Sequence, residues 1–310
     1  MNRSTKQPIP SAKFSPNPKR LNWKLLIKVL LTGLAVYLVS TRIDFPALGV
    51  WIAAVPVPLI LVAFLLFNLS KITGALRLNL FFRAENIQLT TLQNLLLYYK
   101  GMFYNLFLPG GIGGDGYKIY LISNTLGNSW RYVFKAVMWD RVSGAVAILF
   151  LSAVLLLLVP VTYAYSLVLW LTVATAILVF PVFYGITRWI SPAYASITIS
   201  GNLLAILIQL LQAAVALIIF RGLDIAPAQT GEYMVVFFIS SLATIVPITV
   251  GGVGIRELIF LTAARYTAID PNKAVAFSII FFALNAVSAL AGAFVTVHLQ
   301  KPQPKSEVVS

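Results

Sequence analysis

The sequence contains no cysteine and a single histidine, His298. Without thiols the chain can form no disulfide and no thiolate metal site, and one imidazole cannot build a histidine cluster. We therefore expect no bound metal and no other cofactor. Acidic side chains are also scarce, with 9 aspartates and glutamates against 23 lysines and arginines. So few candidate general acids and bases argue against an enzyme.

Charged residues of both signs make up only 10% of the 310 residues, whereas 59% are hydrophobic. A soluble domain has about 25% charged residues, so the composition places the chain among integral membrane proteins. The excess of basic residues gives a net charge of +14. In a membrane protein this excess is typical of cytoplasmic loops that face anionic headgroups. No pattern of interleaved aromatic and basic residues favours nucleic acid as a partner.

Apolar stretches close to the roughly 20 residues that cross a bilayer recur along the chain. We expect six full spans, at about 23–41, 50–69, 135–159, 163–187, 199–220 and 274–299. No cleavage site of small residues follows the first stretch, so residues 1–22 are predicted to form a disordered basic cytoplasmic tail. Residues 23–299 would then form one transmembrane domain, and residues 300–310 a short cytoplasmic tail.

A ten-residue pattern, Pro-x-x-(Ile/Val)-Gly-Gly-x-Gly-x-(Lys/Arg), occurs twice, over 109–118 and 247–256. Proline removes a backbone donor and glycine tolerates unusual backbone angles, so each copy should interrupt a membrane helix. Hydrocarbon cannot satisfy the freed backbone groups, which are tolerated only where protein buries them or water fills a cavity. We expect two re-entrant hairpins, with arms at about 92–108 and 117–127 and at about 232–246 and 253–267.

The basic residues of the loops predict the orientation, because lysine and arginine near span ends stay cytoplasmic. With the N-terminus inside, the polar joint from Lys71 to Glu85 and the returning first hairpin lie inside, and the C-terminus also ends inside. The second hairpin would dip in from the outside, unless one hairpin spans the bilayer and inverts everything after it. The halves, about 23–160 and 161–299, would then form an inverted-topology repeat. The predicted fold is an all-α polytopic protein of a bacterial-type cytoplasmic (inner) membrane.

The first copy of the pattern is suited to an anion. Successive glycines let backbone N–H groups converge, a helix restarting at Tyr117 would add the positive end of its dipole, and Lys118 supplies a full charge. Asp115 complicates this interpretation, because its carboxylate could occupy the same donors or meet a cationic headgroup. Alternatively, the glycines only allow tight helix packing. The candidate substrate-binding residues here are Asn105, Pro109, Gly110, Gly111, Gly113, Gly114, Asp115, Gly116 and Lys118.

In the second copy Val253 replaces the aspartate and Glu257 follows Arg256. Arginine holds phosphate through two parallel hydrogen bonds, and Glu257 is a candidate proton or cation site; the two could instead pair with each other where a helix starts. Asp140-Arg141 is a third candidate, because charges so close to an apolar run normally face a bundle interior, although Arg141 could extend to the headgroups. The candidates in these segments are Asp140, Arg141, Pro247, Gly251, Gly252, Gly254, Arg256 and Glu257.

Two motifs of soluble nucleotide-binding proteins are matched poorly. Residues 111–116 fit G-x-G-x-x-G by letter, but they lie in an apolar membrane segment and not after a strand of a βαβ unit. The P-loop pattern fails because Tyr117 stands where it requires lysine. We therefore expect neither dinucleotide binding nor nucleotide hydrolysis.

Three segments in this order, Leu108 to Tyr117, Asp140-Arg141 and Pro247 to Glu257, resemble the transmembrane region of lysylphosphatidylglycerol synthases and their stand-alone flippase-like relatives. The resemblance extends over most of residues 20–300. In the two-part synthases this region is associated with moving aminoacylated phosphatidylglycerol between leaflets, and a separate cytosolic domain transfers lysine. The residues after 299 leave no room for such a domain, so the resemblance implies lipid translocation without synthase activity.

The sequence thus predicts flipping of a phospholipid or lipid-linked substrate through a central polar cavity. Membrane lipids, anionic or aminoacylated, are the expected partners, and a second copy of the chain or an envelope enzyme stays open as a further partner. Two other functions remain as alternatives. One is a noncatalytic membrane subunit of an envelope lipid-modifying system, and the other is a membrane-embedded lipid phosphate transferase with Asp115 or Asp140 as base.

Overall fold

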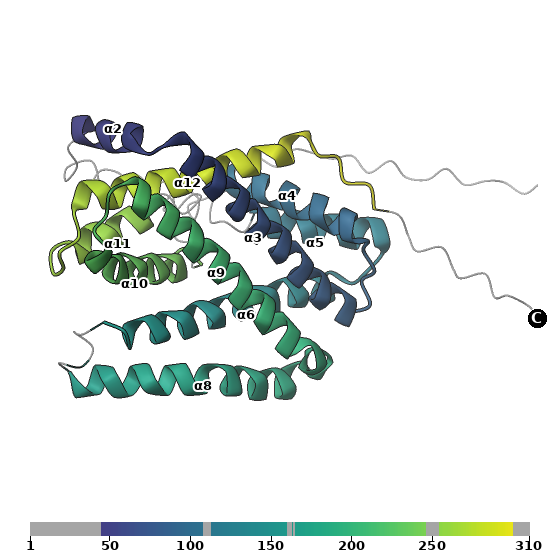
Figure 1. Ribbon diagram of the computed structural model, residues 1–310. Coiled ribbons are helices and arrows are strands. Elements are labelled where there is room, and N and C mark those ends of the chain that lie inside the picture. Colours follow the sequence, from purple (N-terminus) through teal and green to yellow (C-terminus); the bar gives the residue numbers. More distant parts are fainter. Residues whose placement is uncertain (1–44, 108–112, 160–162, 164, 246–253, 300–310) are drawn as a thin grey trace, which may run out of the picture.

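A computed structural model describes residues 45–107, 113–159, 163, 165–245 and 254–299 of the chain (Figure 1). Within these ranges the chain folds entirely into helices and short connections, with no strand. The all-α prediction is therefore confirmed. The helices are α2 (Phe45–Ala54), α3 (Val57–Ala84), α4 (Thr91–Phe107), α5 (Gly113–Leu126), α6 (Trp130–Leu156), α8 (Ser166–Ile190), the 3₁₀ helix η1 (Pro192–Ile197), α9 (Thr198–Gly222), α10 (Pro227–Ala243), α11 (Ile255–Ala263) and α12 (Pro271–Phe294).

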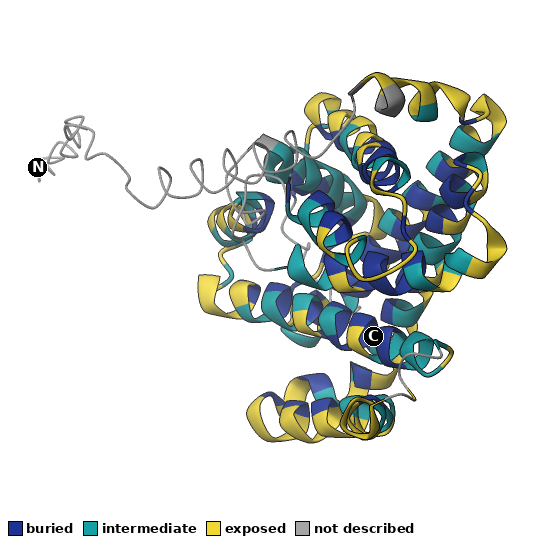
Figure 2. Ribbon diagram, turned by 90° about the vertical axis from the view of Figure 1, so that its left-hand side faces the viewer, coloured by how far each residue is buried: buried dark blue, intermediate teal, exposed yellow. Residues whose placement is uncertain are grey.

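Among the described residues, five helical segments are long and apolar enough to cross a membrane: α3, α6, α8, η1 with α9, and α12. Four of them lie close to predicted spans, although α12 ends at Phe294 and not near residue 299. The first predicted span, 23–41, lies outside the described residues. Helix α8 carries many exposed large apolar side chains, as the outer helix of a membrane bundle does when lipid is its solvent (Figure 2).

The second predicted span, 50–69, and the polar joint after it are wrong. Pro56 has an extended backbone and separates α2 from α3, because proline lacks the N–H that a continuous helix needs. Helix α3 then runs unbroken from Val57 to Ala84, so Lys71 and Arg77 belong to a membrane helix and not to a cytoplasmic loop. From the sequence alone these charges look like loop residues, because no partner for them inside the fold is visible there.

Each glycine motif separates two helices that pack against each other, α4 with α5 and α10 with α11. Two separate helices therefore flank each motif, as predicted, whereas residues 108–112 and 246–253 lie outside the described residues and the re-entrant path of the hairpins stays a prediction. One boundary was predicted wrongly. Helix α5 begins at Gly113 and not at Tyr117, which places Asp115 in its first turn.

The two helix pairs open toward opposite ends of the molecule (Figure 1). Helices α3 and α9 are antiparallel, because Phe81 lies near Gly201 while Val55 lies near Gly222. The α4–α5 pair connects to the C-terminal end of α3 and the start of α6, and the α10–α11 pair connects to the C-terminal end of α9 and the start of α12. This geometry is the one that an inverted repeat requires.

Two groups of buried apolar side chains hold the bundle together. The larger group joins α3, α9, α10, α11 and α12, and its aromatic members Phe67, Phe237, Phe277 and Phe281 pack edge to face or tilted. The smaller group joins the end of α3 to α4, α5, α6 and η1 around Phe81 and Tyr194. Buried positions lie on the inward sides of these helices (Figure 2). Polar side chains inside this bundle therefore need partners of their own.

Candidate functional site

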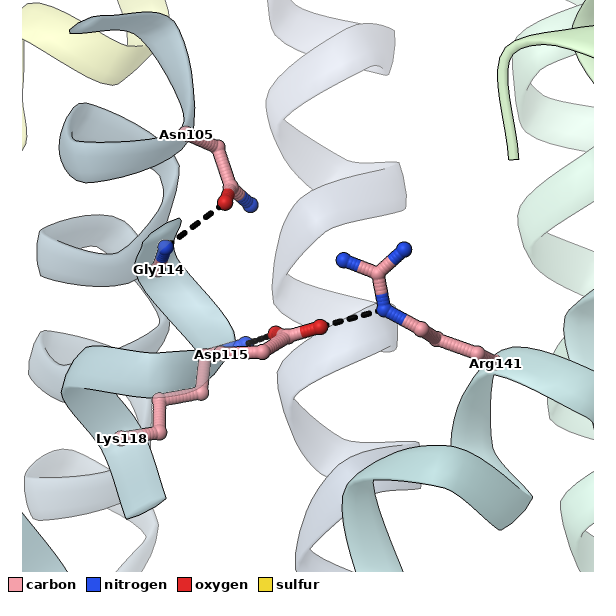
Figure 3. A network of polar contacts seen from close by, with 5 residues as sticks. All are labelled: Asn105, Gly114, Asp115, Lys118 and Arg141. Carbon is pink, nitrogen blue, oxygen red and sulfur yellow. Dashed lines mark hydrogen bonds and ion pairs between the residues drawn. The ribbon is translucent and has the colours of Figure 1, made fainter. Parts of the chain in front are cut away.

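The most concentrated charge in the described part of the bundle surrounds Asp115, in the first turn of α5 (Figure 3). Its Oδ1 lies 3.1 Å from the ammonium of Lys118, one turn along the same helix. Its Oδ2 accepts a hydrogen bond from Nε of Arg141, which reaches across from α6. The Lys118 ammonium also lies 4.9 Å from the centre of the Tyr98 ring. One carboxylate thus neutralises cations from two helices, and we name these three residues the Asp115 cluster.

A second ion pair lies on the neighbouring helices, where Nε of Arg77 in α3 donates to Oδ1 of Asp140 in α6 at 2.7 Å. Sequence reasoning missed Arg77. The available signal was Asp140 itself, since a carboxylate beside a long apolar run demands a cationic partner. Gly144 lies one turn after Asp140, and a Cβ there would come within 3.3 Å of Nη1 of Arg77. The small residue leaves room for the guanidinium.

Most of this charge is removed from the surface. Asp115 is 4% exposed, Lys118 6%, Arg77 7% and Asp140 9%. Isolated charges at such positions would be very unfavourable in a membrane, and pairing is what makes them tolerable. The three cations outnumber the two carboxylates, so the paired groups carry one excess positive charge. That excess favours an anion as the additional ligand.

The two neighbouring residues Asp140 and Arg141 do not pair with each other in the described contacts, but serve two different partners. Adjacent residues of a helix point about 100° apart, so Asp140 faces α3 while Arg141 faces α5. The sequence motif is therefore a junction between two ion pairs. Helix α6 holds both.

Asn105 closes the hairpin from the opposite arm, because its Oδ1 accepts a hydrogen bond from the Gly114 N–H at 2.7 Å. Gly114 also lies against the Gly101 backbone, and a Cβ at Gly114 would collide with that carbonyl. Close packing, the alternative interpretation of these glycines, therefore holds for Gly114. Gly116 is different, since a Cβ there would meet nothing within 4 Å. Gly113 is the first residue of α5, whereas Pro109, Gly110 and Gly111 lie outside the described residues.

The second motif has a different local structure. Gly254 adopts φ +88°, a conformation that favours glycine, and its N–H donates to Oε2 of Glu257 at 2.9 Å. Glu257 is buried and caps the start of its own helix. No salt bridge joins Arg256 to Glu257 among the described side chains, although the charge of Glu257 still attracts Arg256. Pro247, Gly251 and Gly252 lie outside the described ranges.

Arg256 points among aromatic rings and not toward the Asp115 cluster's helices α5 and α6. Its guanidinium carbon lies 4.4 Å from the centre of the Phe281 ring and 5.5 Å from that of Phe237. One of its terminal nitrogens donates to the Ser241 hydroxyl at 3.4 Å. Lys71, which sequence reasoning had placed in a loop, lies over the Phe67 ring at 4.3 Å. The two motifs thus supply two separate polar regions, one around Asp115 and one around Arg256.

A comparison with known protein families identifies the family of this chain. The chain matches the family described as the lysylphosphatidylglycerol synthase TM region over residues 25–292, and it belongs to this family. No curated protein matches the chain. The resemblance predicted from the three motifs is therefore confirmed, and the chain is an integral membrane protein with the transmembrane region of this lipid-related family.

Proposed function

We propose that this member of the lysylphosphatidylglycerol synthase transmembrane-region family moves a phospholipid or lipid-linked substrate between the leaflets of the membrane. The Asp115 cluster would receive the phosphate of the headgroup, and the acyl chains would stay in the bilayer. The membrane would be a bacterial-type cytoplasmic (inner) membrane, with both termini on the cytoplasmic side.

One observation carries this proposal: a buried carboxylate, Asp115, holds a cation from α5 and a cation from α6 at the point where a broken helix restarts. Charges inside a membrane protein are rare and usually mark substrate or ion pathways. A purely structural tie between two helices would need one cation. Here Lys118 and Arg141 share the same carboxylate, so a second oxyanion would find its binding partners already assembled.

The chemistry of the proposed step is an exchange of oxyanions. In the structure the carboxylate of Asp115 serves as the counter-ion of Lys118 and Arg141. An arriving phosphate would accept the same charge-assisted hydrogen bonds as the carboxylate, and arginine can donate to it through two parallel N–H groups. The carboxylate would then turn toward a positive part of the headgroup or take up a proton. Backbone N–H groups of Gly110 and Gly111 are expected to assist the phosphate.

Alternating access would follow from the opposed helix pairs. In inverted-repeat transporters one repeat rocks against the other around a central site. Helix α3 is suited to be the shared wall, since it packs against α9 and also carries Arg77, the partner of Asp140. The sequence contains no ATP-binding motif, so the driving force would be the lipid gradient, a coupled ion or a partner protein.

The direct test is to reconstitute the full chain in vesicles that contain fluorescent phosphatidylglycerol, aminoacylated phosphatidylglycerol or phosphatidylcholine, and to measure leaflet exchange by dithionite quenching. We expect the chain to accelerate exchange of at least one anionic or aminoacylated lipid. The Arg141→Gln and Asp115→Asn variants should slow it, because both change the pairing of charges in the Asp115 cluster.

Lys135→Gln is the matched control. It breaks the 3.1 Å ion pair between Lys135 and Glu85, which lies outside the cluster although Lys135 stands on α6 as Arg141 does, and it should leave exchange unchanged. If verified, folded protein accelerates exchange of none of these lipids, the proposal fails. A different outcome would identify a noncatalytic subunit: cells that carry the cluster variants grow normally, and the protein always co-purifies with one enzyme.

A further inference from the structure

Two cations meet at the aromatic core of the second polar region. Lys71 of α3 lies 4.3 Å from the centre of the Phe67 ring, and Arg256 of α11 lies 4.4 Å from that of Phe281. The two rings pack edge to face with their centres 5.6 Å apart. Because each cation lies over one ring of this pair, the two like charges share one small region and repel each other. Three helices, α3, α11 and α12, thus bring two like charges around one ring pair.

Neither cation forms a salt bridge among the described side chains, although the charge of Glu257 attracts Arg256. The salt bridges of this part of the chain involve Arg77, Lys118, Lys135 and Arg141 only. Glu257 is the nearest acidic residue in sequence to Arg256, but it accepts the Gly254 N–H and caps α11. Within the described ranges, the buried Nε of Arg256 has no hydrogen-bond acceptor. An unsatisfied buried donor of this kind is unfavourable, and more so on a charged group.

Cation–π contacts alone do not offset the repulsion between these two cations. A cation over a ring gains roughly 0.5–2 kcal/mol, which can hold one charge against a ring but does not remove the repulsion between two. An anion between them would turn that repulsion into two attractions and give Nε of Arg256 an acceptor. The Ser241 hydroxyl accepts from the Arg256 guanidinium at 3.4 Å and donates to the Phe237 carbonyl, and it would turn from that carbonyl to donate to the anion.

We infer that Lys71 and Arg256, with the Ser241 hydroxyl, form a second anion site whose ligand is a phosphate group. Phosphate is the oxyanion that two cations and a hydroxyl suit best, because it presents several acceptor oxygens in different directions. The surrounding phenylalanines exclude water and strengthen the charge interactions. The inference rests on the proposed function in one respect: the phosphate would belong to the translocated lipid, although the same groups would also hold free phosphate.

The position of this site relative to the Asp115 cluster suits it to bind the headgroup at a second step of transport. Lys71 belongs to the second site and Arg77 to the ion pair beside the first, and both stand on α3. Six residues of helix separate them, which is about 9 Å along the axis. The same six positions turn the helix by about 600°, so the two side chains point about 120° apart, and a headgroup would move around α3 as well as along it to pass from one site to the other. Two sites of moderate affinity, and not one tight site, are what passage requires.

Binding to the purified full chain in a phosphate-free maltoside detergent tests this inference. The probes are dihexanoyl phosphatidylglycerol and inorganic phosphate, measured by titration calorimetry. We expect Lys71→Gln and Arg256→Gln each to weaken binding of the lipid probe by roughly tenfold to a hundredfold, the worth of one charge-assisted hydrogen bond. Lys71→Arg should keep most of the affinity.

Lys273→Gln is the matched control, since Lys273 also lies over an aromatic ring, 4.5 Å from the centre of Trp51, but away from this site. It should bind like the wild type. A thermal melt without ligand separates binding from folding: losing Lys71 relieves repulsion, so Lys71→Gln should melt no lower than the wild type. Competition by inorganic phosphate would identify the phosphate group itself as the recognised part.

Wild-type affinity in both Lys71→Gln and Arg256→Gln, or no binding of either probe to the wild type, overturns the second site. That failure is distinct from failure of the proposed function. A protein that flips lipid but binds it equally well without Lys71 refutes only the second site, whereas a protein that binds phosphate here but never accelerates leaflet exchange refutes the flipping proposal.

Discussion

The two glycine motifs share nearly the same letters but have different structures. In the first, Asp115 joins a cation of its own helix to one of α6, and Asn105 from the other arm caps the helix start. In the second, the aligned position is Val253, and Glu257 caps its own helix. The carboxylate of the first motif therefore binds cations of α5 and α6, whereas the carboxylate of the second motif binds the backbone at the start of its own helix.

A duplicated motif thus specifies where a helix breaks, but not which partners its charged side chains find. The aligned cations illustrate the point. Lys118 is neutralised by Asp115, whereas Arg256 lies over the rings of Phe237 and Phe281. An inverted repeat with identical halves would bind the same group equally from both sides. In the proposed transport, unequal halves would let one site release the substrate as the other receives it.

The largest expected effect comes from breaking the ion pair beside the first motif. Asp140→Ala leaves the Arg77 guanidinium buried without its carboxylate, and we expect a loss of about 3–5 kcal/mol in the free energy of unfolding. Denaturant unfolding of the protein in bicelles measures it. The double variant Arg77→Met with Asp140→Leu should recover most of the loss, because no charge is then left unpaired. A single-variant loss near zero would show that water reaches Arg77.

Packing of the first hairpin gives the next effect. Gly114→Ala places a Cβ against the Gly101 carbonyl, and neighbouring backbone cannot yield as a flexible side chain can. We expect a loss of about 1–3 kcal/mol, the usual result of overpacking, in the same unfolding measurement. Gly185→Ala on α8 is the control, since a Cβ there meets nothing within 4 Å. Equal stability of both variants would mean that the two arms of the hairpin do not touch in solution.

Two aligned glycines should respond with opposite signs. Gly254 has φ +88°, so Gly254→Ala should destabilise the protein by roughly 1–2 kcal/mol. Gly116, its counterpart, lies inside α5 with open space around it. Gly116→Ala should therefore stabilise by about 0.5–1 kcal/mol, because alanine favours a helix more than glycine does. Changes of the same sign, measured by thermal unfolding, would contradict the different helix starts.

The smallest effects should come from the two helix caps. Asn105→Ala removes the acceptor of the Gly114 N–H, and Glu257→Ala removes that of the Gly254 N–H. We expect each to lower stability by roughly 0.5–2 kcal/mol. Amide hydrogen exchange locates the effect: protection should fall at the start of α5 in the first variant and at the start of α11 in the second. Loss of protection at both starts in either variant would mean that the hairpins unfold together.

Much of the fold could be predicted, because long apolar runs have few structures open to them in a bilayer. The positions of α6, α8, α9 and α12, and the interruptions near Pro109 and Pro247, follow from composition and from the chemistry of proline and glycine. Helix α3 could not be predicted in the same way. Its central charged residues are typical of a loop in the sequence, and only the structure shows that Asp140 neutralises Arg77.

Most residues of the candidate site were predicted from the sequence, but the ion pairs and hydrogen bonds between them were not. Asn105, Asp115, Lys118 and Arg141 were all proposed, and the structure brings them together, while Arg256 and Glu257 lie in another region with other partners. Lys71 and Arg77 escaped prediction because each owes its role to residues far away along the chain. Sequence spacing reports neighbours within a helix, but a contact across helices depends on how the bundle packs.

The amino-acid sequence is enough to specify a helical membrane protein with two matched breaks, since hydrocarbon excludes unpaired backbone and solvated charge. The pairing of its charges follows from the packing of the helices. Asp115 lies between Lys118 and Arg141 because α5 and α6 cross there, and Arg256 lies over Phe281 because α11 packs on α12. Electrostatic energy depends on distances of a few ångströms, and those distances are set by the packing of whole helices.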